Sequence, residues 1–115
     1  MNIYKRAHPE ELRIKESDKI LTKYTTRIPV IVCKDQSCKL ADIDKQKFLV
    51  PKDMTLAQFI YIIRKRIDLR SDEALFTLIN NNLLTGSRLM EHVYDSEKDK
   101  DGFLYIVYTS ENTFG

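Results

Sequence analysis

Residues 47–67 read KFLVPKDMTLAQFIYIIRKRI and contain the pattern that decides the fold. The apolar run at 47–50 predicts a short strand, which Pro51 ends because proline has no N–H to give to a sheet. Thr55 followed three residues later by Gln58 is the signature of a helix N-terminus. Apolar residues then recur at helical spacing, at Leu56, Phe59, Ile60, Ile63 and Ile67. The stretch therefore predicts an edge strand followed directly by an amphipathic helix.

The rest of the chain adds elements on both sides of this pair. The further predicted elements are a short helical turn at 3–7, an amphipathic helix at 10–24, strands at 28–33, 74–79 and 102–109, and a short helix at 87–94. Pro29 suits an edge or the start of a strand, and residues 34–44 show no periodicity. This order predicts an α+β protein of the β-grasp type, in which a mixed four-stranded sheet packs on a central helix behind an N-terminal helical extension.

Length and composition describe one ordinary globular domain. The chain has 115 residues, of which 43% are hydrophobic and 31% charged. It contains no apolar run of the ~20 residues that cross a bilayer and no signal-peptide core near its start. The two cysteines, Cys33 and Cys38, have no partners at metal-binding spacing. We expect two free thiols in a reducing cytosol.

The charge is uneven along the chain. Residues 1–27 hold seven basic and four acidic side chains, a net charge of +3, whereas the other residues hold 12 basic and 13 acidic ones, a net charge of −1. A mildly basic N-terminal segment suits acidic peptides or an anionic membrane surface as partner. It is too weak and too mixed to indicate nucleic-acid binding.

Patterns for catalysis are absent from the sequence. There is no glycine-rich phosphate loop, no nucleophile elbow and no cluster of metal ligands. His8 and His92 lie at opposite ends of the chain. Lys34 follows Cys33, but no histidine is placed to act as its base. We therefore expect no enzymatic activity, no metal and no cofactor.

Six segments carry a resemblance to a known family. They are residues 27–31, 47–51, 58–59, 63–67, 98–105 and the C-terminal ENTFG at 111–115. Together they closely resemble the autophagy ubiquitin-like modifiers, which include the GABA-receptor-associated protein and microtubule-associated light chain three. The resemblance implies a ubiquitin-like β-grasp core at 27–109, an N-terminal helical extension at 1–26 and a conjugation tail at 110–115.

The resemblance also implies what the tail does. Gly115 would be joined to the amine of phosphatidylethanolamine by activating and conjugating enzymes that pass it on as thioesters, and a cysteine protease would process or deconjugate it. Glycine has no Cβ, so its carboxylate can enter a narrow enzyme channel. The sequence leaves open whether this glycine is terminal in the gene product or is exposed by processing. The implied setting is the cytoplasm and, after lipidation, the autophagosomal or another vesicle membrane, with a monomer before conjugation.

A second implied function is the recruitment of cargo receptors and adaptors through short aromatic-x-x-aliphatic motifs that pair with the strand at 47–50. By the resemblance, the aromatic pocket would use Glu16, Ile20, Pro29, Ile31, Lys47, Leu49 and Phe103. The aliphatic pocket would use Phe48, Val50, Pro51, Met54, Phe59, Ile62, Ile63 and Arg66. Arg27, Lys45 and Lys47 would meet acidic residues that flank the motif. Lys47, Phe48 and Leu49 carry the most weight, since Phe59 and Ile63 also fit an ordinary core.

The sequence departs from the family pattern at a few positions. Glu10 stands where an aromatic residue is common, Phe48 replaces tyrosine, the turn at 82–86 lacks a proline pair, and the loop at 34–40 is individual. None of these departures touches Gly115 or Lys47, so they bear on partner selectivity rather than on the core function. Three alternatives to that function remain open. They are an adaptor of the same fold that is never conjugated, a modifier with a non-autophagic organelle role, and a membrane-surface or cytoskeletal protein held electrostatically by its basic N-terminal helix.

Overall fold

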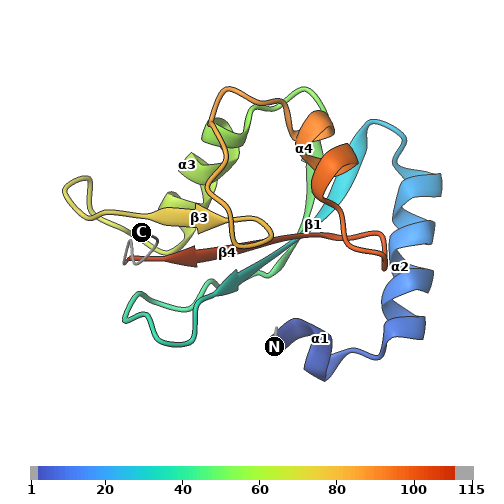
Figure 1. Cartoon of the computed structure of the whole chain (residues 1–115), viewed down its shortest axis with the longest axis horizontal. Helices are drawn as coiled ribbons and strands as arrows, with labels where there is room; N and C mark the ends of the chain where they lie inside the picture. The colour runs from blue at the N-terminus through green and yellow to red at the C-terminus, as the bar shows by residue number, and fades with distance from the viewer. Residues whose placement is uncertain (1–2, 111–115) are drawn as a thin grey trace.

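The computed structural model describes residues 3–110. Its elements are α1 (Ile3–Ala7), α2 (Glu10–Lys23), β1 (Arg27–Lys34), β2 (Lys47–Pro51), α3 (Leu56–Arg66), β3 (Phe76–Leu78), α4 (Met90–Glu97) and β4 (Leu104–Thr109) (Figure 1). The mixed four-stranded β-grasp with N-terminal helices, predicted from the sequence, is confirmed. The predicted boundaries of the extension, core and tail stay a prediction.

The sheet has the strand order β2-β1-β4-β3. Strand β1 runs antiparallel to β2 and parallel to β4, and β3 runs antiparallel to β4. Pro29 lies in a central strand, but the register with β4 begins one residue later, where Val30 lies opposite Leu104. The missing N–H of the proline therefore falls at the start of that pairing, as expected for proline in a sheet. Strand β2 is left at the edge of the sheet.

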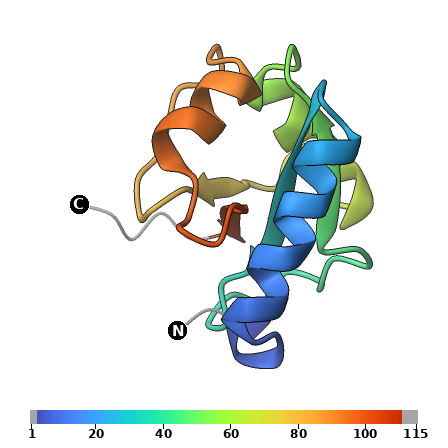
Figure 2. The same cartoon turned by 90° about the vertical axis from the view of Figure 1, so that its right-hand side faces the viewer.

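Helices cover both faces of the sheet, and Figure 2 shows α2 on the other side of β1 from α4. Alternate residues of β1 point to the two faces. Val30 and Val32 belong to the main core with residues of α3 and α4. Ile31 and Cys33 belong to a second core cluster with Tyr4 of α1, Ile20 of α2 and Phe103. The N-terminal helices thus bury one face of the sheet.

Helix α3 has a well-formed cap at each end. The Thr55 hydroxyl accepts from Gln58 N–H and the Gln58 side chain accepts from Thr55 N–H, so the predicted capping box is confirmed. At the other end Asp68 has φ 55°. Asp68 N–H donates to Lys65 C=O at 3.2 Å, and Leu69 N–H donates to Arg64 C=O at 3.1 Å. This pair of bonds is a Schellman motif, whose left-handed position usually holds glycine.

Three predicted boundaries were wrong. The short helix begins at Met90 rather than 87, because Leu89 bridges to Thr55 and Leu56 N–H bonds Arg88 C=O, which keeps 88–89 extended. Strand β3 is shorter than predicted and covers only Phe76–Leu78. Strand β4 begins at Leu104, because Gly102 (φ 91°) lies in a turn closed by its N–H to Asp99 C=O.

Candidate functional site

The free edge of β2 is the feature of the fold that most resembles a docking site. Val32 N–H donates to Gln46 C=O at 2.8 Å, and Lys52 N–H donates to Thr26 C=O at 3.0 Å. Antiparallel ladders alternate, and Val30 lies opposite Phe48. The even-numbered residues of β2 therefore pair with β1, and the backbone groups of Lys47 and Leu49 point to the open edge. These groups can accept and donate hydrogen bonds to an added strand.

One side chain already contacts this edge. The guanidinium of Arg27, the first residue of β1, donates from Nη1 to Leu49 C=O at 3.1 Å. Arg27 is exposed to solvent. The Leu49 carbonyl is therefore occupied by the Arg27 side chain, which is exposed and can move away when another donor arrives. Arg27 is one of the residues predicted to meet acidic flanks.

The predicted aromatic pocket gathers on the face covered by α2. Cross-strand partners Ile31 and Lys47, and Pro29 and Leu49, share this face. Leu49 packs against the second core cluster, which includes Ile20, Ile31 and Phe103. Ile31 and Phe103 are fully buried and form a floor, whereas Leu49 is half-buried. The structure thus brings all of these predicted residues together.

Lys47 and Glu16 form an ion pair across the rim of this face. Glu16 comes from α2 and Lys47 from β2, and both side chains keep more than a third of their surface exposed. A depression of about 530 Å³ lies on the exposed side of α2 and is lined by Leu12, Lys15, Glu16 and Lys19. Glu16 therefore contributes both to this depression and to the ion pair with Lys47.

The predicted aliphatic pocket lies on the other face of β2, under α3. Phe48 and Val50 are buried, and the Phe48 ring meets Phe59 edge-to-face with centroids 5.4 Å apart. Phe59 and Ile63 are fully buried core residues. Met54, Pro51 and Ile62 are half-buried, and Arg66 is exposed. By alternation Pro51 follows the face of Lys47 and Leu49 rather than that of Phe48.

Two cations lie against the ring of Phe48. Lys45 Nζ is 5.1 Å and the Arg66 guanidinium carbon 5.5 Å from the ring centroid, within the range of a cation–π contact. Arg66 Nη1 also lies 3.1 Å from both carboxylate oxygens of Asp44. The predicted cations of the site thus have partners within the protein.

Sequence reasoning missed a buried network that holds α2 on the sheet. The Asp101 carboxylate accepts from Arg13 Nη1 at 2.5 Å, from Tyr105 OH at 2.5 Å and from Phe103 N–H at 2.8 Å. Ser17 OH donates to Asp101 C=O at 2.5 Å. The run DKDG at 99–102 has the composition of a turn, but that signal does not identify the partners of Asp101. Because α2 supplies Glu16 and Ile20, this network positions one wall of the site.

A second layer of this network involves α1. Lys5 Nζ lies 2.6 Å from Asp99 Oδ1. Burial alone would raise the pKa of Asp99, but the hydrogen bond from Lys5, the hydrogen bond from Asp101 N–H and the positive charges of Lys5 and Arg13 together lower it. Burial, followed by the hydrogen bond to Asp101, raises the pKa of Tyr105 far above its usual value. The phenol therefore remains a hydrogen-bond donor throughout the physiological range.

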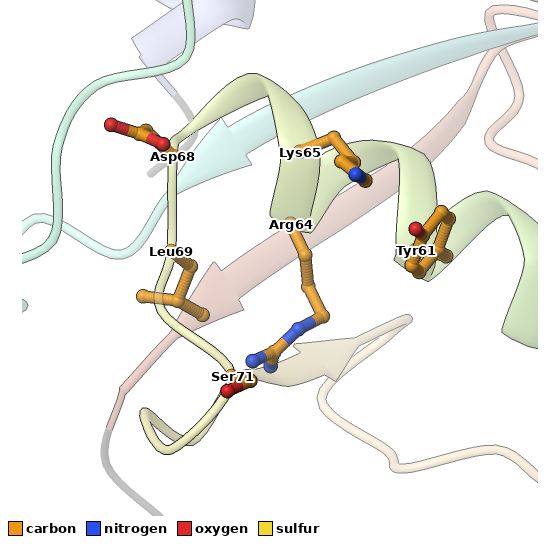
Figure 3. Close-up of a pocket in the computed structure, with 6 residues that line it drawn as sticks. All are labelled: Tyr61, Arg64, Lys65, Asp68, Leu69 and Ser71. Atoms are coloured by element: carbon orange, nitrogen blue, oxygen red, sulfur yellow. The ribbon is translucent and has the colours of Figure 1, made fainter.

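Another depression, of about 290 Å³, lies away from β2 at the end of α3. Tyr61, Arg64, Lys65, Asp68, Leu69 and Ser71 line it (Figure 3). Arg64 points from α3 towards Ser71. Its Nη2 donates to Arg70 C=O at 2.9 Å and to Glu73 C=O at 3.0 Å. Arg64 thus fastens the turn after α3.

The remaining features concern the two cysteines, groups that could bind a metal, helices that could span a membrane, and Gly115. Cys33 and Cys38 are both buried, and neither forms a disulfide. Within residues 3–110, no group of three or more His, Cys, Asp and Glu side chains could hold a metal ion. No helix in the same range has both the length and the hydropathy of a membrane span. Gly115, the predicted conjugation residue, lies outside the described residues.

A mixed sheet of order β2-β1-β4-β3 that packs on one central helix is the fold of ubiquitin-like proteins, and here N-terminal helices cover its second face. The sequence pattern of the family described as "Autophagy protein Atg8 ubiquitin like" matches residues 12–115. The chain is 47% identical over 114 residues to Autophagy-related protein 8b of Arabidopsis thaliana. The aligned region covers 99% of this chain and 93% of that protein.

Further relatives agree. Autophagy-related protein 8 of Vanderwaltozyma polyspora is 48% identical over 112 residues, with 97% of this chain and 95% of that protein covered. The crystal structure of Trypanosoma brucei ATG8 superposes with a TM-score of 0.91 at 38% identity and covers 100% of this chain and 99% of that one. The chain belongs to the Atg8 family of autophagy ubiquitin-like modifiers.

Proposed function

We propose that this protein is conjugated through Gly115 to phosphatidylethanolamine, and that its β2 edge recruits cargo receptors and adaptors bearing an aromatic-x-x-aliphatic motif. The observation that supports the docking role best is the open edge of β2 with a different apolar cluster on each of its faces. Family membership supports the conjugation role.

The spacing of the motif fits these two faces. Side chains alternate along an extended strand, so residues three apart point to opposite faces. A peptide that extends the sheet at β2 would direct its aromatic residue to the side of Leu49 and its aliphatic residue to the side of Phe48. Its backbone would bond the edge groups of Lys47 and Leu49, after Arg27 leaves the Leu49 carbonyl.

The affinity should be modest. Two buried anchors contribute about 2–3 kcal/mol each and a few net hydrogen bonds about 1 kcal/mol each. These gains must exceed the entropy lost on association. We expect micromolar dissociation constants, which correspond to a binding free energy of about −8 kcal/mol.

Conjugation would follow the chemistry of ubiquitin-like proteins. A nucleoside triphosphate would first convert the Gly115 carboxylate to an acyl-nucleotide anhydride with loss of pyrophosphate, and the thiol of the activating enzyme would then displace the nucleoside monophosphate to form a thioester. The acyl group would pass to the thiol of the conjugating enzyme and then to the lipid amine, and each transfer would release the previous thiol. Beyond Thr109, the last residue of β4, residues 110–115 can extend at most ~20 Å, which would let the folded body stay outside the enzyme while its carboxylate reaches a catalytic cysteine. Two acyl chains then give a stable anchor, whereas one chain gives only marginal binding.

The experiment is membrane fractionation of cells that express the wild-type protein or Gly115→Ala, with washes at low salt and at 1 M salt. A covalent lipid anchor predicts wild-type protein that resists both washes and a variant that stays in the supernatant. Attachment that the salt wash releases would instead favour electrostatic binding by the basic N-terminal helices. Attachment of the variant equal to wild type would disprove conjugation through Gly115.

A further inference from the structure

The loop before β2 supplies an acidic residue that contacts a predicted binding-site cation. Arg66, at the end of α3, places Nη1 at 3.1 Å from both Oδ1 and Oδ2 of Asp44. Its guanidinium carbon lies 5.5 Å from the centroid of Phe48. Asp44 therefore fixes Arg66 beside the entrance of the face that would take the aliphatic anchor.

This ion pair does little for the fold. The Asp44 side chain is 68% exposed and that of Arg66 37% exposed. Ion pairs in such surroundings add little to stability because water and salt screen them. A carboxylate from a ligand could therefore replace Asp44 at small cost. Among the described residues, Arg66 Nε and Nη2 make no hydrogen bond and could hold such a carboxylate.

We propose that Asp44 is a specificity-determining residue, which lowers the preference of the β2 site for peptides with an acidic side chain on the face of the aliphatic anchor. This inference rests on the proposed docking function. Asp44 competes with the peptide carboxylate for Arg66, the cation that it contacts.

Strand geometry identifies the peptide position that is affected. In an aromatic-x-x-aliphatic motif, the first intervening residue lies two positions before the aliphatic anchor and shares its face. A glutamate there would lie on the side of Phe48 and Arg66. A glutamate at the second intervening position would point to the other face. The affinity of such a peptide should not change when Asp44 is replaced.

The test is calorimetric titration of two peptides, Trp-Glu-x-Leu and Trp-Gln-x-Leu, into wild type, Asp44→Asn and Asp42→Asn. Asp42 is the matched control, because it lies in the same loop and pairs with Lys34 rather than with the site. We expect Asp44→Asn to tighten the glutamate peptide by about two- to fivefold, the range of an exposed ion pair, and to leave the glutamine peptide nearly unchanged. Asp42→Asn should match wild type. In Arg66→Gln the effect of Asp44→Asn should vanish.

The contrary results are distinct. An equal change for both peptides in Asp44→Asn, or the same gain in Asp42→Asn, would overturn the assignment while leaving the docking site intact. A gain that persists in the Arg66→Gln background would also overturn it. Binding of neither peptide to folded wild-type protein would refute the proposed docking function, and the role of Asp44 with it.

Discussion

Replacing Arg13 by methionine should destabilise the protein strongly, although Arg13 lies in an N-terminal helix outside the β-grasp core. Arg13 and Asp101 are both buried, with 9% and 0% of their side-chain surface exposed. Methionine keeps most of the apolar stem of arginine and removes the charge. The variant would leave the Asp101 carboxylate buried without its cation.

The magnitude follows from what remains around that carboxylate. Removing one partner of a buried ion pair costs about 3–5 kcal/mol. Tyr105 OH and Phe103 N–H still donate to Asp101 in the variant, so we expect the lower end, about 3 kcal/mol. Urea unfolding measures it: with a slope of about 1–3 kcal/mol per molar, the midpoint should fall by about 1–3 M.

Lys5→Met is the control, because the Lys5–Asp99 pair is partly exposed and should be worth at most about 1 kcal/mol. The double variant Arg13→Met/Asp101→Asn should lose less stability than the two single losses added together, since it removes both charges. An Arg13→Met protein within about 1 kcal/mol of wild type would refute the reasoning that α2 is held by a buried ion pair.

Three further changes test separate parts of the structure. Asp68→Gly should stabilise by about 0.5–1 kcal/mol in thermal unfolding, because glycine takes the left-handed conformation without strain; an equal gain from Asp68→Ala would contradict this. Thr55→Ala should cost about 1 kcal/mol through loss of the capping box, and a cost near zero would show that the cap is unimportant. The lowered folded-state pKa of Asp99 gives stability that is present above the ordinary carboxyl pKa and is lost as pH falls through the folded value. The difference in unfolding free energy between wild type and Lys5→Met should therefore shrink as the pH falls below about 4, to what the contact of Lys5 with the Tyr105 ring contributes; a difference that does not change with pH would exclude the ionised carboxylate as a source.

Local signals predicted the central elements well. The capping box at Thr55 and the helical spacing of apolar residues located α3, because both signals depend only on neighbours in the sequence. The start of α4 was wrong because Leu89 is held extended by Thr55, a contact that no local pattern reveals. The short β3 depends in the same way on its pairing with β4.

In the candidate site, too, features that depend on neighbours in the sequence could be predicted, whereas features that depend on distant contacts could not. Alternation along β2 predicted that Phe48 and Leu49 face opposite sides, and they do. Burial depends on the other elements, so the sequence could not show that Phe103 forms a closed floor while Leu49 stays accessible. The Asp101 network joins residues more than 80 positions apart, and a single sequence has no pattern for such a pair.

The central claim is that the β2 edge binds aromatic-x-x-aliphatic peptides. The most direct test is calorimetric titration of an acidic Trp-x-x-Leu peptide into wild type, Leu49→Asp and Tyr61→Asp, the last a control at an exposed position on α3. We expect micromolar binding to wild type and the control, and none to Leu49→Asp. A peptide N-methylated at its edge-bonding amide should also fail, without any change to the protein. Unchanged affinity for Leu49→Asp and for the methylated peptide would contradict docking at β2.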